Sequence, residues 1–365
     1  MALTTVLTPN QVIEFSKTVM TEYFNQSGFA KYTNTSANAI VQIRNEFINK
    51  PAAQVNFPVL RQLTGDGVSG SKQLWGNEEV LPNSTDVVTI AYIRNGTQIT
   101  NQQNAQSEID ILNQARPILV NWAANKLRKD IMAQLCGVLV PSTYTALGST
   151  TDTVDDVVAY ASATAAQKAT HFANNSDRIY AGGTGTVTSE TDIADKAASI
   201  TSVDDYLAIT AAIRNTLAGS FGVRPVESNN DTGTKTYVWF VDNYVFSKIK
   251  AALASQLAMA DVRGTDNDLM QNGDLYFDGV VVRLIPELQN SALTLTNSSS
   301  ASVNVHRSFV CGAQAILLAY GARDVIKMQT FDYEFQHGVS IACLRGLKKS
   351  SYNGVEMGVM EIFSI

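Results

Sequence analysis

Charged side chains are scarce in this sequence of 365 residues. Asp, Glu, Lys and Arg make up 16% of it, against about 25% in an average soluble domain. Apolar residues make up 45%. A chain with few charges offers little surface suited to water, so we expect much of its surface to be buried against other chains. The length is sufficient for one large hydrophobic core or two modest ones.

The sequence also lacks a basic cluster. Lys and Arg number 27 and Asp and Glu number 33, which gives a net charge of −6, and the densest basic stretch is the pair Lys348-Lys349. Proteins that bind nucleic acid through its phosphates carry clustered positive charge. The composition therefore argues against sequence-specific binding of nucleic acid, whereas a mildly acidic surface is suited to enclosing DNA without trapping it.

Cysteines are few, and targeting signals are missing. Cys136, Cys311 and Cys343 form no CxxC pair, which argues against a disulfide framework and against a zinc site. The first residues lack the basic and apolar regions of a signal peptide, and no apolar run approaches the roughly 20 residues that span a membrane. We expect a reduced, intracellular folding environment and no membrane partner.

Histidine is equally sparse, and no catalytic motif surrounds it. His171, His306 and His337 are far apart in the sequence, and none lies in HExxH or beside a GxSxG nucleophile motif. We predict no catalytic residue, no cofactor and no metal ion, and hence no enzyme. A hydrolase whose ligands meet only in the folded chain is the alternative left open by the sequence.

Three polar segments resemble ligand-binding motifs only superficially. Residues 65–70 match GxGxxG, but the dinucleotide-binding motif requires a helix to follow, and residues 71–84 are polar and interrupted by glycine and proline. Residues 182–185 lack the Gly-Lys-Ser/Thr ending of a phosphate-binding loop. The acidic group between Asp261 and Asp268 lacks calcium-loop spacing. We interpret all three as loops.

The first 54 residues predict an N-terminal arm. The sequence Thr8-Pro9-Asn10-Gln11 has the form of a helix start. Val12, Phe15 and Val19 follow at helical spacing. A single apolar stripe on a short helix needs a partner surface, so we predict that these three residues contact another subunit.

Residues 55–104 predict a long hairpin. Apolar residues alternate at 55–59 and cluster at 87–93, which predicts two strands, and glycines mark the loop between them. An isolated two-stranded hairpin is marginal in water, so this one must lie on its own chain or on a neighbour. Trp75, with Glu78 and Glu79 beside it, lies in that loop. The tryptophan either folds back or contacts another subunit, and we favour the intersubunit contact for all three residues.

The longest helical pattern covers residues 105–137. Pro117 lies inside it and removes a backbone hydrogen bond, so we predict a kink there. The sequence further predicts a helix at 204–217, a strand at 237–241 followed by a helix that Asp242 caps, and a strand at 280–285. It also predicts successive strands within 325–365, separated at 337–338, 348–353 and 358. Residues 140–200 carry little periodicity.

Several blocks of the sequence resemble the tailed-bacteriophage major capsid proteins, in particular the coat-protein group of enterobacterial phage N-four. The blocks are Leu63 to Gly70 with Leu74 and Gly76-Asn77-Glu78-Glu79, Phe309 to Ala315, Asp332-Tyr333, His337-Gly338-Val339, Gly346-Leu347-Lys348-Lys349 and Gly358-Val359-Met360. They follow one another in the order of that group.

The resemblance implies an α+β chain with the Hong Kong 97-like capsid fold. It divides the chain into an N-terminal arm (1–54), an extended β-hairpin loop (55–104), a peripheral domain (105–200) with a spine helix (105–137), an axial domain (201–320) and C-terminal strands that return to both domains (321–365). A kink at Pro117 would let the spine helix bend between precursor and mature shells.

The implied function is self-assembly into the icosahedral head shell of a tailed phage with double-stranded DNA. The implied partners are further copies of the chain in hexamers and pentamers, scaffolding, portal and decoration proteins, and enclosed DNA without sequence-specific binding. The shell would assemble in the cytoplasm of the host bacterium and end in the virion. An encapsulin-type nanocompartment is the alternative with the same fold, and a secreted β-rich adhesin is disfavoured by the missing signal peptide.

Overall fold

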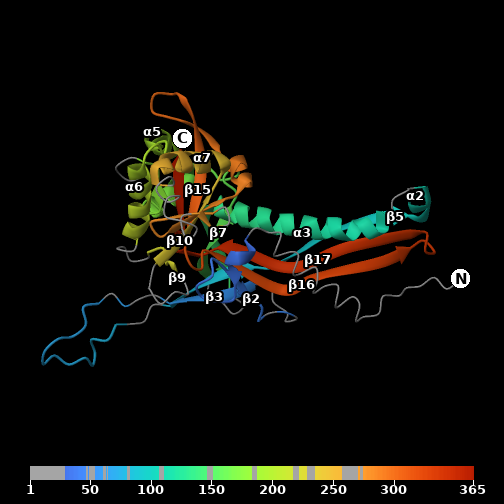
Figure 1. The fold of residues 1–365 in the computed structure, drawn as a ribbon. Coiled ribbons are helices and arrows are strands. Elements are labelled where there is room, and N and C mark those ends of the chain that lie inside the picture. The colour runs from blue at the N-terminus through green and yellow to red at the C-terminus, as the bar shows by residue number, and fades with distance from the viewer. Residues whose placement is uncertain are drawn as a thin grey trace.

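The fold was analysed in a computed structural model of the chain. The structure describes residues 29–46, 48, 54–60, 63, 65–79, 83–106, 111–145, 151–182, 187–216, 222–227, 235–256, 270–271 and 274–365. A block of strands and short helices forms one end of the molecule, a long arm of helix and strands leaves it on one side, and a loop projects on the other (Figure 1).

The arm is built on a sheet that we call the long sheet. Its strands are, in spatial order, β1 (Thr33–Asn34), β2 (Val41–Arg44), β16 (Ile316–Phe331), β17 (Gln336–Lys349) and β5 (Ala91–Thr100). β16 and β17 form an antiparallel hairpin from the pair Ile316 and Lys349 to its turn. The predicted strand break at 337–338 is wrong, because both residues pair inside β17 and the turn lies at 332–335.

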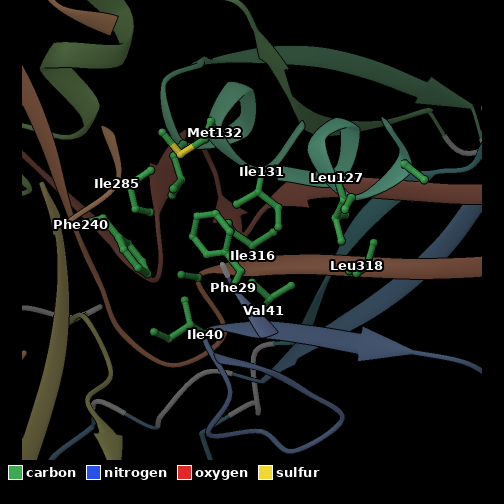
Figure 2. Close-up of a cluster of buried hydrophobic side chains, with 14 of the residues drawn as sticks. Phe29, Ile40, Val41, Leu127, Ile131, Met132, Phe240, Ile285, Ile316 and Leu318 are labelled. Carbon is green, nitrogen blue, oxygen red and sulfur yellow. The ribbon is translucent and has the colours of Figure 1, made fainter. Parts of the chain in front are cut away.

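Helix α3 (Ile111–Leu135) lies along the long sheet. Its apolar residues recur at spacings of three and four, which places them on one face. That face packs on the sheet in the largest hydrophobic core (Figure 2), whose members include Leu127 and Ile131 of α3, Leu318 of β16 and Phe240 from the neighbouring block. The predicted helix at 105–137 is therefore present, although a separate short helix, α2 (Asn101–Gln106), precedes it.

A second sheet, which we call the broad sheet, forms the block. Its strands are, in spatial order, β11 (Met270–Gln271), β12 (Asp274–Phe277), β13 (Val280–Leu284), β10 (Lys235–Val241), β15 (Ser302–Cys311), β20 (Val359–Ser364) and β8 (Ile179–Tyr180), with β14 (Leu293–Thr296) beside β15 and β9 (Val226–Glu227) beside β10. The strands predicted at 237–241 and 280–285 are thus confirmed as β10 and β13.

Two helices pack on the broad sheet. They are α6 (Val203–Asn215) and α7 (Asn243–Ala252), and their apolar faces form a second core with β10, β13 and β20. Asp242 caps α7, since its Oδ1 accepts a hydrogen bond from the Val245 amide at 2.7 Å. The predicted helix at 204–217 and the predicted cap are therefore confirmed where the structure describes them.

Residues 138–200 form a hairpin and, in the block, two short helices, the first of which lies next to the hairpin. β6 (Val138–Thr145) and β7 (Thr151–Val158) form a hairpin that continues from α3. Helices α4 (Ala165–Asn174) and α5 (Glu190–Lys196) pack with β14, β15 and β20 in a third core. Most of 160–200 thus packs on the broad sheet, whereas the expected peripheral domain placed all of 105–200 together. That division into domains stays a prediction.

The hairpin predicted within 55–104 consists of β3 (Gln54–Leu60) and β4 (Asn83–Thr89), which pair antiparallel. Ile90 lies between the two strands β4 and β5. β5 pairs with β17 in the long sheet and not with β3. The single second strand expected at 87–93 is therefore wrong, because its two halves pair with different partners. The remaining short elements are η1 (Ala30–Tyr32), η3 (Pro286–Ser291), β18 (Ser351–Tyr352) and β19 (Val355–Glu356).

Candidate assembly surfaces

The loop between β3 and β4 is described for residues 65–79. Two glutamates of the loop accept hydrogen bonds from its backbone amides. Glu79 Oε2 accepts a hydrogen bond from the Gly65 amide at 2.8 Å, and Glu78 Oε2 accepts one from the Gly76 amide at 2.7 Å. Gly76 has a φ of 86°, which favours glycine. Both carboxylates therefore fix the path of the loop. Their predicted contact with another subunit is untested and stays a prediction.

Apolar side chains on this loop face solvent. Trp75 is 85% exposed, Leu74 is 60% exposed and Leu63 beside the loop is 55% exposed. The alternative in which Trp75 folds back on its own chain is thus wrong, and the loop projects away from the body in Figure 1. Exposed apolar groups of this size mark interaction surfaces. We call residues 63–79 the apolar loop.

The opposite end of the same hairpin is buried. Val55 and Phe57 pack with Val88 and Ile90 in a fourth core that continues into β16. We call this end, β3 and β4 with the core beneath them, the hairpin root. An ion pair of Asp86 also holds the hairpin root to the rest of the chain.

Asp86 forms a buried ion pair that joins the hairpin root to the end of β17. Lys348 Nζ donates to Asp86 Oδ1, and the Ser351 amide donates to Asp86 Oδ2 at 3.0 Å. Both charged side chains are almost completely buried. Burial raises the pKa of Asp86, whereas Lys348 lowers it. Two strands far apart in the sequence are therefore fixed together.

A second exposed apolar surface, which the sequence analysis missed, lies at the turn between β16 and β17. Tyr333 is fully exposed, and Phe331 and Phe335 are partly exposed on either side of it. The turn is tied to α2, because Asn101 Nδ2 donates to the Glu334 carbonyl at 2.8 Å. The signal was present in the sequence as an aromatic residue at every second position from 331 to 335.

The other predicted contact residues have different outcomes. Val12, Phe15 and Val19 lie outside the described residues. Pro117 lies inside α3 on its exposed side, next to the largely exposed Ile118, and the helix continues through it. A kink at Pro117 stays a prediction.

The histidines have separate structural surroundings. His306 Nδ1 lies 2.5 Å from Asp242 Oδ2 beside α7, and His337 lies near the far end of β17. His171 belongs to α4 and is buried on its inner side, where its Nδ1 accepts a hydrogen bond from the Leu139 amide at 3.3 Å. Burial lowers the pKa of His171 to about 4, so its ring is neutral at neutral pH. Each histidine has a structural partner or a place in a strand.

The glycine-rich and acidic segments offer little chemistry. No helix begins within the described residues 65–79, so GxGxxG is a loop, as interpreted. The acidic segment 261–268 lies outside the described part of the chain, as do residues 183–186. Across the described ranges, no group of three side chains is arranged to hold a metal ion. Within the same ranges no helix is long and apolar enough to cross a membrane.

A family model described as phage capsid protein matches residues 3–364. The chain belongs to this phage capsid protein family. A curated relative, the major capsid protein of Pseudomonas phage KPP25, is 26% identical over 364 residues, which cover 94% of this chain and 92% of the relative. The family explains why large apolar side chains remain in solvent on a chain with two well-formed sheets.

Solved structures of phage capsids share the fold. The capsid of cyanophage Pam1 has a TM-score of 0.74 and 26% identity, covering 92% of this chain and 91% of that one. The capsid of Ralstonia phage GP4 has a TM-score of 0.67 and 18% identity, covering 91% and 89%. The expected family and the expected α+β capsid fold are therefore confirmed. The narrower resemblance to the group of phage N-four stays a prediction.

Proposed function

We propose that this chain is the major capsid protein of a tailed phage and assembles with copies of itself into the icosahedral head shell. The apolar loop is the observation that carries the proposal. Its large apolar side chains project into solvent, whereas most apolar residues of the described chain fill four cores. Membership of the phage capsid protein family supports the same conclusion.

The contacts between copies follow from the shape of the chain. A loop that projects on one side can reach a surface on the other side of the next copy, which is a head-to-tail contact. Such contacts close into rings when the rotation between copies permits it. Rings of six and five copies then tile a closed shell. The turn between β16 and β17 offers a second surface for contacts between rings.

Further partners belong to the same proposal. The net charge of −6 suits a shell that encloses double-stranded DNA without binding its sequence. Scaffolding, portal and decoration proteins would join the shell, which would assemble in the host cytoplasm and become part of the virion. An enzymatic role is not proposed, because the family is a structural one.

The encapsulin alternative is not favoured. The curated relative and the solved neighbours described above are phage capsid proteins. Double-stranded DNA inside particles isolated from infected cells, together with a portal, would separate a phage head from a compartment that packages enzymes.

Electron microscopy of the purified recombinant chain tests the proposal. We expect closed particles, and we expect a variant in which residues 65–79 are replaced by a short Gly-Ser linker to stay folded but form none. A matched control replaces Lys72, an exposed polar residue of the same loop, with alanine and keeps the particles. Normal particles from the linker variant would rule out the role of the loop.

A further inference from the structure

A carboxyl group with an unsatisfied oxygen lies between α3 and the long sheet. Asp324 of β16 is 2% exposed, and among the described residues no hydrogen-bond donor reaches its Oδ2. The thiol of Cys343, on β17, is hydrogen-bonded to the same carboxyl group. Most buried polar atoms in folded proteins are paired, so this acid needs an explanation.

An irregularity in the strand directs Asp324 inward. Between two regular stretches of the β16–β17 pairing, Arg323 and Asp324 lie opposite the single residue Cys343. Such a β-bulge changes the face to which a side chain points. Arg323 is exposed and Asp324 is buried. The bulge therefore places an acidic side chain against the helix layer.

A small cavity of about 10 Å³ adjoins Asp324 beneath α3. This volume is close to the minimum that one water molecule requires. The polar residues that line it are Asp324, Lys126 of α3, and Cys343 and Arg345 of β17. The apolar residues that line it are Ile93, Trp122, Ala123 and Ile341. The site is thus lined by α3 and by the three strands β5, β16 and β17.

Two cations beside the cavity share one carboxylate. Arg345 Nη2 donates to Asp130 Oδ2 at 2.8 Å, and Lys126 Nζ donates to Asp130 Oδ1 at 2.5 Å. Because Asp130 and Lys126 belong to α3 and Arg345 belongs to β17, the first of these pairs ties the helix to the sheet. A second negative charge at Asp324 would compete with Asp130 for Arg345.

We propose that Asp324 is a proton-operated latch between α3 and the long sheet. With a proton, its carboxyl group leaves Arg345 on Asp130, and the tie between helix and strand is complete. Without the proton, the carboxylate draws Arg345 or a water molecule into the cavity, and the tie weakens. On β16 itself, Arg323 lies on the exposed side of the strand. Tyr320 of the same strand is buried, and burial together with Asp324 raises the pKa of its hydroxyl, so it stays neutral.

Burial places the loss of the Asp324 proton in a pH range that can be reached by experiment. Burial raises the pKa of Asp324 from 3.8 to about 6, although the Cys343 thiol and Arg323 oppose the rise. Burial lowers the pKa of Arg345 to about 10, so this side chain stays a cation throughout. An acid whose pKa is raised on folding stabilises the fold below its unfolded pKa. That stability is lost as the pH rises from 3.8 through about 6.

The size of the effect follows from the same values. A pKa of about 6 in the folded chain against 3.8 corresponds to about a hundredfold change in the equilibrium between closed and open states. The latch acts within one chain and does not depend on the proposed function. In a shell it would make the stiffness of every arm depend on pH.

Hydrogen exchange of the full-length chain tests the latch. We expect the protection of α3 and β17, corrected for intrinsic rates, to fall by about tenfold between about pH 5 and about pH 7.5, because the rest of the hundredfold change lies below pH 5. The variant Asp324→Asn should lose the share of this fall that Asp324 contributes and keep the share from Asp86 and Asp130, whose pKa values burial also raises. The matched control Asp156→Asn, an exposed acid on strand β7, should keep the whole fall. A fall in Asp324→Asn as large as that of the wild-type chain would overturn the proposal.

His171 titrates with the opposite sign and is unaltered in both variants. The lowered pKa of this buried base means that its contribution to stability falls as the pH falls. Comparison of each variant with the wild-type chain at the same pH therefore isolates Asp324.

Infrared difference spectroscopy gives a second measurement that does not need the asparagine variant to fold. Burial also raises the pKa of Asp86, Asp130 and Glu361, so several protonated carboxyl groups can contribute to the carbonyl band. In the wild-type chain we expect one component of this band to disappear with a midpoint near pH 6. The variant Asp130→Asn should shift this midpoint downward, because Arg345 then becomes available to Asp324. A wild-type chain in which no component has a midpoint near pH 6, or in which that midpoint is the same in Asp130→Asn, would also overturn the proposal.

Discussion

The two ends of the β3–β4 hairpin differ in what covers them. At the root, Val55 and Phe57 are buried in a core of the same chain, and Asp86 pairs with Lys348. At the other end, Leu74 and Trp75 face solvent. Both ends carry large apolar side chains, but only the root meets its partner within one chain. The root therefore contributes to the folding of the subunit, and the apolar loop contributes to its assembly.

This division can be broken by single substitutions, ranked here by their effect on the folding of one chain. The largest effect is expected from Asp86→Ala, which leaves Lys348 buried without its carboxylate. Breaking a buried ion pair costs about 3–5 kcal/mol, to be measured by chemical denaturation. The double variant Asp86→Leu with Lys348→Met should recover most of that loss. If Asp86→Ala lowered the unfolding free energy no more than a surface substitution does, the ion pair would not stabilise the root.

The next effect is expected from Phe57→Ala. The ring is 3% exposed and fills the core under the hairpin, and the substitution leaves a cavity that costs about 3 kcal/mol or more. The same denaturation experiment measures it. Replacement of Asn56, an exposed neighbour on β3, serves as the control and should leave the unfolding free energy within about 0.5 kcal/mol of wild type.

A smaller loss is expected from Gly346→Ala, which tests how closely β17 approaches β4 at the root. An added Cβ would lie 2.3 Å from the Thr89 carbonyl oxygen and 2.8 Å from a Val88 methyl carbon, so the strands would have to separate. Overpacking of this kind costs about 1–3 kcal/mol. A thermal unfolding midpoint equal to that of the wild type would mean that β17 and β4 leave room for the added methyl group.

The smallest effect on folding is expected from Trp75→Ala in the apolar loop. Trp75 is 85% exposed. Its replacement by alanine should therefore change the unfolding free energy by less than about 0.5 kcal/mol. Particle yield should nevertheless fall sharply, because a buried tryptophan is a frequent anchor of interfaces. Lys72→Ala is again the control. Wild-type yield from Trp75→Ala would remove the distinction between the two ends.

Helices, strands and caps that depend on residues close together in the sequence could be predicted. The apolar spacing of α3, the buried strand β10 and the cap at Asp242 depend on neighbours along the chain, and each was confirmed. The exposed loop with Trp75 was also predictable, because glycine and polar residues surround it. The family followed from short blocks of matching residues.

The long-range pairings could not be read from the sequence. The split between β4 and β5 at Ile90 depends on which strand offers a free edge, and β17 lies about 250 residues further on. The Asp86–Lys348 pair and the bulge at Asp324 likewise exist only once distant strands meet. Residues 138–200 gave little periodicity because short elements there pack on strands from elsewhere.

Hydroxyl-radical footprinting of the tryptophans, read by mass spectrometry, tests most directly whether sister copies cover the apolar loop. In unassembled chains Trp75 should be strongly oxidised, and Trp239, which is fully buried in the broad sheet, should not. In assembled shells Trp75 should become protected, while Trp239 stays unchanged. Equal oxidation of Trp75 in single chains and in intact shells would contradict the account.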